Sequence, residues 1–356
     1  QSGGPTSLIN SSLAGVYKNA VERGFDKVYG MLHGIQGLLD EQYIDLSTQI
    51  HSELDIELLK RTPSAFLGSC RYKLPEIHED RAIYEKIFEI LNKLEIYAFI
   101  YIGGNDSMDT IKKLSDYAII TGQTQKFLGV PKTIDNDLWG TDMTFGFQSA
   151  VNIATNAIDC IHTTAASHRR VFIVEVMGHK VGWLTLHAGL AGGADIILIP
   201  EIPYDIKSVV AALNRRTKAG KNFSILAVAE GAISKQDAAL PKKELKQKLK
   251  DNPYPSVSYK IGSEIQELTG QEVRITVPGH TQRGGSPCPY DRVLASRLGA
   301  AAAKLIIDKQ YGYMVGIKNG EIVKVPLADV AGRLKMVDPN ASIINEAKML
   351  GISFGD

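Results

Sequence analysis

The sequence predicts an α/β fold with mostly parallel sheets, divided into two domains. The chain has 356 residues, about twice the length of a typical single domain. Apolar residues make up 44% of it, enough to form large buried cores. Short apolar runs also alternate with segments of helical periodicity. This alternation along one chain is typical of parallel sheets with helices on both faces.

Each expected element follows from its own pattern. The apolar runs predict buried strands at Val28–Leu32, Tyr97–Ile102, Phe127–Val130, Val171–Val176, Ile196–Ile199 and Phe223–Val228. Helical periodicity predicts helices at Ser7–Val21, Asp80–Leu94, Met108–Ala118, Gln148–Thr163 and Lys207–Ala219. Because the chain opens directly on a glycine turn, we expect one more strand before residue 1. In parallel sheets, ligands bind in the loops that follow the strands.

Composition excludes several classes of function. Lys and Arg number 40 against 39 Asp and Glu, so a net charge of +1 gives no general attraction for nucleic acid. No apolar run approaches the ~20 residues that cross a bilayer. The three cysteines form no CxxC pair, so neither a zinc site nor a disulfide framework is indicated. We therefore expect a protein of the reducing cytoplasm. The lysine-rich segment Lys235–Asp251 is interpreted as a solvated surface helix.

One loop that could carry chemistry is Tyr101–Ser107, with the sequence Tyr-Ile-Gly-Gly-Asn-Asp-Ser. It follows a predicted strand and precedes a predicted helix. Two glycines let the backbone approach a ligand, and a helix N-terminus offers N–H groups and a positive dipole end to an anion. The alternative is an ordinary turn capped by Asp106 or Ser107. The loop is neither GxGxxG nor a P-loop, which disfavours the Rossmann and Walker interpretations.

A second loop, Val130–Asp137, also follows a predicted strand. Two carboxylates, one lysine and one hydroxyl lie within Lys-Thr-Ile-Asp-Asn-Asp. A carboxylate beside a lysine and an anion site suits the removal of a proton from a hydroxyl. The alternative is a polar turn held by Asx hydrogen bonds. The density of ionisable groups favours the functional interpretation.

Three further segments are weak when taken alone: Ser2–Thr6, Glu175–Lys180 and Pro278–Pro287. Taken together and in order, all five segments resemble the phosphofructokinase family from Ser2 to about Arg292. The resemblance implies two similar three-layer α/β domains with an active site in the cleft between them. A donor-binding domain would comprise 1–138 with about 284–310. A sugar-phosphate-binding domain would comprise 139–283 with about 311–356.

The resemblance also implies a reaction and the residues that perform it. The reaction is phosphoryl transfer to the 1-hydroxyl of fructose 6-phosphate, with Asp135 as general base and Lys132 and Asp106 beside it. The implied sugar-phosphate-binding residues are Thr133, Arg170, Met177, Gly178, His179, Glu230, Arg274, His280 and Arg283. Gly3, Arg71, Gly104 and Ser107 would hold the phosphoryl donor, and Asn105 and Asp137 would hold Mg²⁺. Arg170 and Arg274 would reach the 6-phosphate from a neighbouring subunit, which implies a homodimer or homotetramer with shared sites.

Two positions lead us to expect pyrophosphate as the donor. ATP-dependent members of the family have glycine at the positions of Asp106 and Lys132, and this chain resembles the pyrophosphate-dependent members at both. A carboxylate about 5 Å from the α-phosphate of ATP would cost ~3 kcal/mol at an effective dielectric of ~20. Lys132, facing pyrophosphate, would compensate the charge of the leaving phosphate. Such a reaction is reversible and serves glycolysis or gluconeogenesis.

Two residues depart from the family pattern, and three alternatives stay open. Asn105 stands where the family has a magnesium-binding Asp, and His179 stands where Arg is more usual. One alternative is an ATP-dependent 6-phosphofructokinase. Another is a pyrophosphate-dependent kinase of a different sugar phosphate, such as sedoheptulose 7-phosphate. The third, a non-catalytic sugar-phosphate-sensing subunit, is disfavoured because Asp135, Thr133 and Lys132 are all present.

Overall fold

The computed structural model describes residues 1–356 and confirms the α/β fold with mostly parallel sheets. The chain divides into two compact units. The first unit comprises residues 1–149 and 283–335, and the second comprises residues 150–282 and 336–356. Residues 139–149 and 311–335, which we expected in the second domain, lie in the first unit. The reason for the latter is strand pairing, because two strands within 313–326 extend the sheet of the first unit.

The first unit is built on a sheet of order β11-β10-β4-β3, with β5 pairing β4 as well. Its strands are β3 (Ala98–Gly103), β4 (Lys126–Thr133), β5 (Phe145–Gly146), β10 (Tyr313–Lys318) and β11 (Glu321–Pro326). All neighbours are parallel except the β10–β11 pair. The expected strand at 28–32 instead forms a separate antiparallel ribbon of β1 (Tyr29–Met31) with β2 (Tyr43–Asp45).

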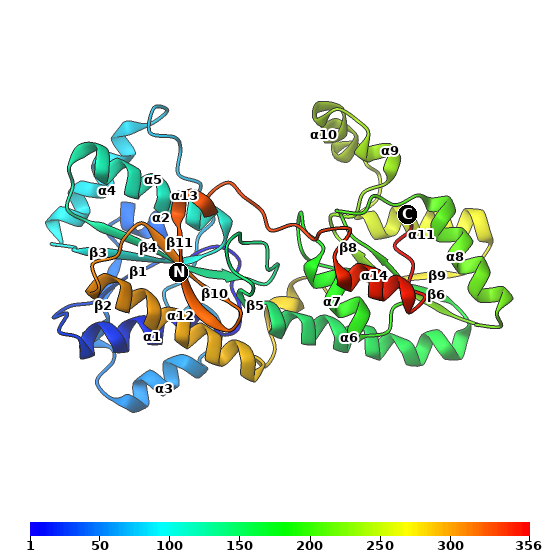
Figure 1. Cartoon of the computed structure of the whole chain (residues 1–356), viewed down its shortest axis with the longest axis horizontal. Helices are drawn as coiled ribbons and strands as arrows, with labels where there is room; N and C mark the ends of the chain where they lie inside the picture. The colour runs from blue at the N-terminus through cyan, green and yellow to red at the C-terminus, as the bar shows by residue number, and fades with distance from the viewer. The chain divides into compact units, whose positions relative to one another are not determined.

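Helices cover both faces of this sheet, as alternation of strand and helix predicts (Figure 1). One face carries α2 (Gly34–Leu39), α4 (Arg81–Lys93), α5 (Asn105–Thr121) and α13 (Leu327–Val330). The other carries α1 (Ile9–Glu22), α3 (Glu53–Arg61) and α12 (Pro289–Ile307), with the short helix η1 (Leu46–Thr48). Each face buries its own apolar cluster, so β4 is buried along nearly its whole length.

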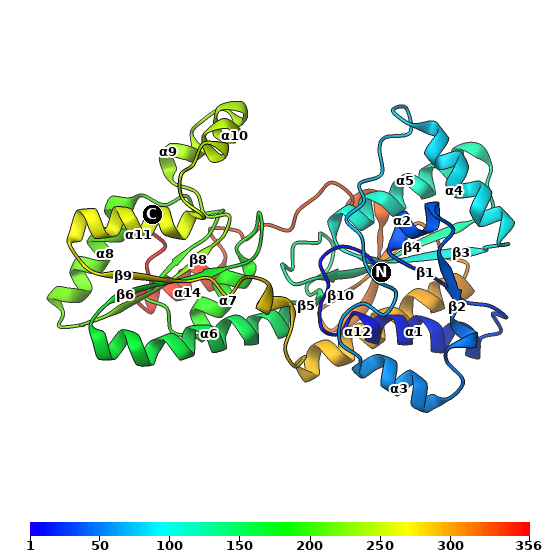
Figure 2. The same cartoon turned by 180° about the vertical axis from the view of Figure 1, so that it is seen from behind.

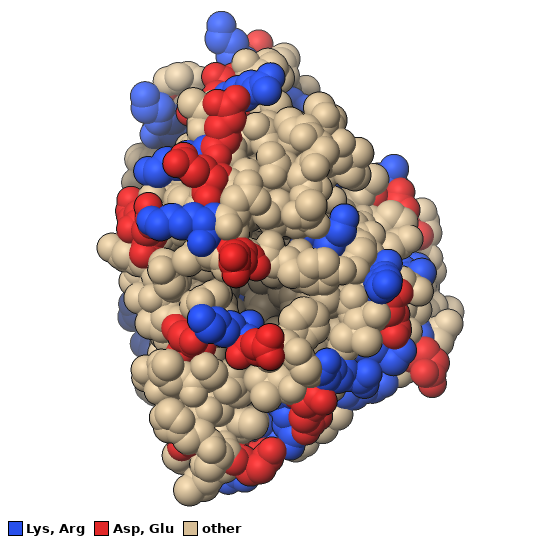
Figure 3. Space-filling view, turned by 90° about the vertical axis from the view of Figure 1, so that its left-hand side faces the viewer, with Lys and Arg blue, Asp and Glu red and all other residues tan.

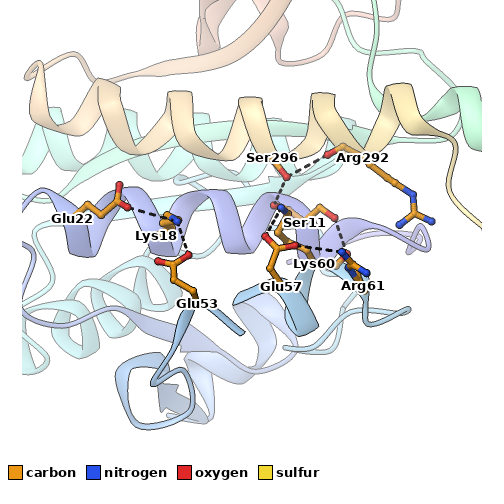
Figure 4. Close-up of polar contacts among 9 residues, drawn as sticks. All are labelled: Ser11, Lys18, Glu22, Glu53, Glu57, Lys60, Arg61, Arg292 and Ser296. Carbon is orange, nitrogen blue, oxygen red and sulfur yellow. Dashed lines mark hydrogen bonds and ion pairs between the residues drawn. The ribbon is translucent and has the colours of Figure 1, made fainter. Parts of the chain in front are cut away.

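Helices α1 and α12 approach each other closely, because glycine lies at their crossing. A Cβ on Gly15 would lie 2.4 Å from the Ser296 carbonyl oxygen, and one on Gly299 would lie 2.1 Å from the Ser12 carbonyl oxygen. Figure 4 shows the polar contacts around this crossing, in which Ser296 Oγ donates to the Ser11 carbonyl. On α3, the Lys60 carbonyl accepts from Ser11 Oγ at 2.9 Å. The crossing fixes the loops that precede α1 and α12.

The second unit contains a four-stranded, fully parallel sheet of order β7-β8-β6-β9. Its strands are β6 (Val171–Val176), β7 (Ile196–Leu198), β8 (Ser224–Ala229) and β9 (Val273–Thr276). Its helices are α6 (Phe147–His168), α7 (Trp183–Ala191), α8 (Ile206–Lys218), α11 (Val257–Thr269) and α14 (Ser342–Met349), with the short helix η2 (Gly279–Arg283). Helices α8 and α11 cover one face, and α6 and α7 lie on the other (Figures 1 and 2).

The lysine-rich segment forms two short helices rather than one. Helix α9 (Lys235–Ala238) and helix α10 (Lys242–Lys250) are separated at Pro241, which cannot donate the backbone hydrogen bond of a continuous helix. Helix α10 buries no residue, so the expectation of a solvated surface helix is confirmed for it. Together the two helices project from the layer of α8 and α11 in Figure 1. No helix of the protein is long and apolar enough to span a membrane.

Candidate active site

The turn before α1 lies beside β3 and is shaped by two glycines. The Ser2 N–H donates to the Ile102 carbonyl at 2.9 Å, and the Gly3 N–H donates to the Cys70 carbonyl at 2.9 Å. Gly3 has φ +76°, a backbone conformation that glycine adopts without strain. A Cβ on Gly3 would lie 3.1 Å from Lys132 Nζ, and one on Gly4 would lie 2.9 Å from the guanidinium carbon of Arg283. The glycines therefore leave room for two cationic side chains.

Lys132 is the buried cation of this cluster. It is the penultimate residue of β4, is only 2% exposed, and its Nζ donates to the Gly4 carbonyl at 2.6 Å. Burial lowers the pKa of Lys132 to about 8, because a charge is poorly solvated in the interior. Asp135 and Asp137 act against this lowering of the pKa, and Arg71 and Arg283 add to it. Three cations and two carboxylates thus act on one another within the first unit.

Arg283 also belongs to this cluster, and its role in binding the sugar phosphate stays a prediction. The resemblance assigned it to the sugar phosphate, whereas it lies against Gly4 in the first unit. Arg71, by contrast, is an exposed residue on the loop that follows Cys70, whose carbonyl accepts from Gly3. The Gly3–Gly4 turn therefore contacts both Arg283 and the segment of Cys70 that precedes Arg71.

The N-terminus of α5 provides backbone N–H donors. Its N-cap is Gly104, which provides no side-chain cap, so the first turn keeps donors for a ligand. The hydroxyl of Ser107 lies 2.5 Å from that of Ser2, and both residues are buried. Ser107 therefore fixes the two turns to each other. Asp106 is exposed in the first turn of α5.

The loop that follows β4 holds the two carboxylates that the sequence singled out. The Asp135 N–H donates to Thr133 Oγ1 at 3.0 Å, which closes a tight turn. Asn136 adopts φ +53°, and its side chain accepts from the Thr144 N–H at 3.0 Å. Asp135 is half-buried, whereas Asp137 is buried. The loop is thus held at both ends, and Asp135 is the less buried of its two carboxylates.

The residues present fit a magnesium ion. Asn105 Nδ2 donates to Asp137 Oδ2 at 2.6 Å, which places an amide and a carboxylate side by side. Magnesium is commonly bound through one or two carboxylates together with substrate phosphates. No group of three or more His, Cys, Asp or Glu residues is arranged to hold a metal ion on its own. The site therefore suits a metal that arrives with a phosphate donor.

In the second unit, the expected sugar-binding loop is fastened through its backbone. Glu230 Oε1 accepts from the His179 N–H at 2.8 Å and from the Gly178 N–H at 3.3 Å. Glu230 and His179 are exposed, and Met177 is half-buried. The Met177 N–H donates to Oε1 of Gln282 at 3.2 Å, and Gln282 Nε2 donates to the Gly279 carbonyl. The turn that carries exposed His280 is thereby joined to the Met177 loop.

Arg170 and Arg274 lie near the amino-terminal ends of strands β6 and β9, whereas Met177 follows the carboxyl end of β6. Both guanidinium groups pair with the carboxylate of Glu272, Arg170 at 2.6 Å. Arg170 directly precedes β6, whereas Met177 directly follows it. Six residues of strand separate the two ends by roughly 20 Å. Arg170 therefore lies at the opposite end of β6 from Met177.

Sequence reasoning missed several residues that position the site. Gln282 joins two loops. It is the first residue of the Gln-Arg-Gly-Gly-Ser-Pro motif, so the motif could have indicated it. Glu175 is buried and accepts from Ser256 Oγ at 2.5 Å, which fastens the segment before α11. Asp291 is fully buried and accepts from the N–H and hydroxyl of Ser149. No local pattern marks the last contact, because its partners are 142 residues apart.

The face of the molecule in Figure 3 carries no large patch of one charge. Figure 3 shows one face, on which Lys and Arg lie among Asp and Glu without a large patch of one sign. This distribution agrees with the net charge of +1. Anion binding is therefore a property of local loops rather than of a whole face.

Comparison with known proteins identifies relatives over the whole chain. A family model described as phosphofructokinase matches residues 1–306. ATP-dependent 6-phosphofructokinase of Spirochaeta thermophila is 44% identical, covering 100% of this chain and 96% of that protein. ATP-dependent 6-phosphofructokinase 3 of Bacteroides thetaiotaomicron is 38% identical, covering 99% of this chain and 98% of that protein.

These relatives correct the expected donor. The prediction of pyrophosphate is wrong, because relatives at 37–44% identity over the full chain are ATP-dependent. The repulsion assigned to Asp106 used an effective dielectric of ~20 and left the dipole of α5 out of account. Asp106 is exposed, so water screens its charge, and the positive end of α5 offsets part of it. Lys132 already donates to Gly4, so its ammonium is partly satisfied within the protein.

A solved structure shows the same fold at lower identity. The pyrophosphate-dependent phosphofructokinase from Nitrosospira multiformis superposes with a TM-score of 0.83 and 29% identity, covering 96% of this chain and 86% of that chain. Fold, motif order and full-length similarity agree with one another. The chain therefore belongs to the phosphofructokinase family.

Proposed function

We propose that the protein catalyses the ATP-dependent phosphorylation of fructose 6-phosphate at its 1-hydroxyl, forming fructose 1,6-bisphosphate and ADP. The observation that carries the proposal is the convergence of Lys132 and Arg283 on the Gly3–Gly4 turn. These groups lie in one unit with the loop that bears Asp135 and Asp137. The ATP-dependent relatives support the choice of donor.

Each group has a role that its surroundings support. Half-buried Asp135 takes the proton of the attacking hydroxyl as general base. The ammonium of Lys132 and the guanidinium of Arg283 stabilise the charge on the transferred phosphoryl group. Backbone N–H groups at the start of α5 bind donor oxygens. Asp137 and the amide oxygen of Asn105 would hold Mg²⁺, which neutralises phosphate charge when bound with the donor.

The second unit would bind the acceptor sugar phosphate. Glu230 fixes the Gly178–His179 backbone, and Met177 and His280 lie on the two loops that Gln282 joins. Thr133 would contact the reacting end of the sugar from the first unit. A neighbouring subunit would supply Arg170 and Arg274 to the 6-phosphate, since they lie at the other edge of the sheet. The protein would therefore work as a homo-oligomer. Its cytoplasmic location stays a prediction.

A donor and acceptor comparison tests the function. The purified chain is supplied with Mg²⁺, fructose 6-phosphate and either ATP or pyrophosphate, and the formation of fructose 1,6-bisphosphate is followed. Turnover with ATP is expected. Turnover only with pyrophosphate would contradict the proposed donor, and turnover with neither would contradict the proposed reaction. Sedoheptulose 7-phosphate in place of fructose 6-phosphate tests whether the acceptor is correctly assigned.

A further inference from the structure

The segment that follows α13 lies along the loop with Asp135 and Asp137. Leu334 forms an isolated antiparallel bridge with Leu138, and the Lys335 N–H donates to the Asp137 carbonyl at 2.8 Å. These contacts join residues almost 200 positions apart in the chain. All of them lie within the first unit. The backbone of Lys335 thus fastens the loop immediately after its second carboxylate.

The side chain of the same lysine holds the far limb of the loop. Lys335 Nζ donates to the Thr141 carbonyl and to the Asp142 carbonyl, each at 2.9 Å. The Asp142 carbonyl also accepts from Asn136 Nδ2 at 3.3 Å. One residue therefore bonds both limbs of the 136–142 loop, through its backbone at Asp137 and through its ammonium at 141–142.

The surroundings of the ammonium explain why a lysine is required there. The two carbonyl oxygens need donors, and an ammonium provides three in a compact group. Burial lowers the pKa of Lys335 to about 8, and Asp142 and Asp137 act against that lowering. An uncharged apolar side chain of similar length would leave both carbonyls without this donor.

We propose that Lys335 is a positioning residue for the reaction, which holds the loop that carries Asp135 and Asp137 in its reactive geometry. The inference rests on the proposed function, in which Asp135 is the base. Lys335 acts through the loop and touches no substrate. The local sequence Arg-Leu-Lys-Met does not indicate this role. Lys335 is brought close to the 136–142 loop by the bridge between Leu334 and Leu138.

Kinetics of three variants test the proposal. Lys335→Met removes the ammonium and keeps the backbone contact with Asp137. We expect kcat to fall roughly 10- to 100-fold, as for a small misplacement of a reacting group. KM for ATP and for fructose 6-phosphate should change less than about threefold, since binding groups stay in place. Lys335→Arg, which restores a cationic donor, should recover much of kcat. Lys324→Met is the control, because exposed Lys324 bonds Gln310 rather than the loop.

The outcomes separate positioning from general stability. A uniform loss of active protein, with kcat per folded molecule unchanged, would overturn the proposal. So would equal effects of Lys335→Met and Lys324→Met, or a rise in KM with kcat intact. Thermal unfolding of each variant gives the folded fraction. If Lys335→Met does not fold, Lys335→Gln replaces it, and wild-type kcat in that variant would overturn the proposal.

A second readout needs no kinase activity. The chain has two tryptophans, and Trp139 lies within the loop, 45% exposed. In a Trp183→Phe background, fluorescence anisotropy reports on Trp139 alone. Lys335→Met should lower the anisotropy, whereas Lys324→Met should leave it unchanged. An unchanged anisotropy in Lys335→Met would overturn the positioning role even if the wild-type enzyme phosphorylated fructose 6-phosphate. A lowered anisotropy in an enzyme without turnover would instead identify the proposed function as the failing part.

Discussion

The candidate sites of the two units are organised in opposite ways. In the first unit, the ammonium of Lys132 is buried, and Asp137 and Ser107 are buried beside it. In the second unit, Glu230, His179 and His280 are exposed, and the contacts that order them are made by backbone N–H groups. The first site is therefore set before a ligand binds, because its side chains already hold one another. The second fixes the course of its loops and leaves side chains to be ordered by the ligand.

The largest effect on kcat is expected from a substitution in the site of the first unit. Asp135→Asn keeps the size of the side chain and removes its basicity. We expect kcat to fall by about 10²- to 10⁴-fold, the usual contribution of a general base. The Kd for fructose 6-phosphate, measured by calorimetry, should change little because the loop is held by Thr133 and Asn136. A variant with near-normal kcat would show that Asp135 is not the base.

The second prediction tests whether the candidate site of the second unit is completed by residues of another subunit. Arg170→Ala should raise KM for fructose 6-phosphate by roughly 10- to 100-fold, since a charged hydrogen bond to phosphate is worth ~1.5–3 kcal/mol. At low fructose 6-phosphate, hybrid oligomers of Arg170→Ala and Asp135→Asn subunits should be more active than either parent. Demonstrated hybrids without recovery would mean that each chain uses its own Arg170.

The third prediction concerns the projecting helices of the second unit. Burial raises the pKa of Asp237, but hydrogen bonds from Lys248, Lys260 and Ser234 outweigh it and lower the pKa to about 2. A depressed pKa stabilises the fold above the ordinary value near 4, and this stabilisation is lost as pH falls from about 4 to 2. Asp237→Asn should cost about 2 kcal/mol in the free energy of unfolding at pH 7.

The comparison between pH 7 and pH 3 decides this third prediction. Part of the wild-type advantage over Asp237→Asn should disappear at pH 3, where Asp237 begins to take up a proton. Asp251→Asn is a suitable control, because Asp251 is exposed on the same segment and bonds only Gln247 among the contacts described. Equal losses in both variants, or a difference independent of pH, would contradict the role of the two lysines.

The smallest effect is expected from adding one methyl group to the site of the first unit. In Gly4→Ala, the new Cβ displaces the flexible end of Arg283, which lies 2.9–3.1 Å away. KM for ATP should rise only a few-fold, with Tm unchanged, because a side chain moves more cheaply than backbone. The effect should vanish in an Arg283→Ala background. Additive effects in the double variant would show that Gly4 acts independently of Arg283.

Much of the fold and the main loops could be predicted from the sequence, for a local reason. The strands at 97–102, 127–130 and 171–176 are buried on both faces, so their apolar runs are continuous. Strands β10 and β11 were not predicted, because β10 follows the long helix α12 without a distinct apolar boundary and β11 mixes buried and exposed residues. Because these strands were not expected, 311–335 was assigned to the second domain, whereas the structure groups these residues with the first unit.

Two of the expected site residues lie together in the structure, although their roles stay predictions. Asn105 and Asp137 do meet, since the ends of adjacent parallel strands lie together. Lys335 and Gln282 could not be foreseen, because their partners are set by tertiary contacts. The donor was misjudged because the strength of a charge depends on its exposure, which the sequence of the Asp106 turn does not specify.

The close crossing of α1 and α12 has a consequence for the order in which the protein is made. Residues of α1 leave the ribosome well before Gly299 of α12, against which they pack, and before β10, which pairs with β4 and begins at residue 313. At ~5–20 residues per second, some 8–30 seconds of translation separate residue 149 from that strand. During this interval Leu128 and Gly129 of β4 lack the strand that pairs with them in the folded protein. The nascent chain should therefore depend on chaperones most strongly before β10 is synthesised.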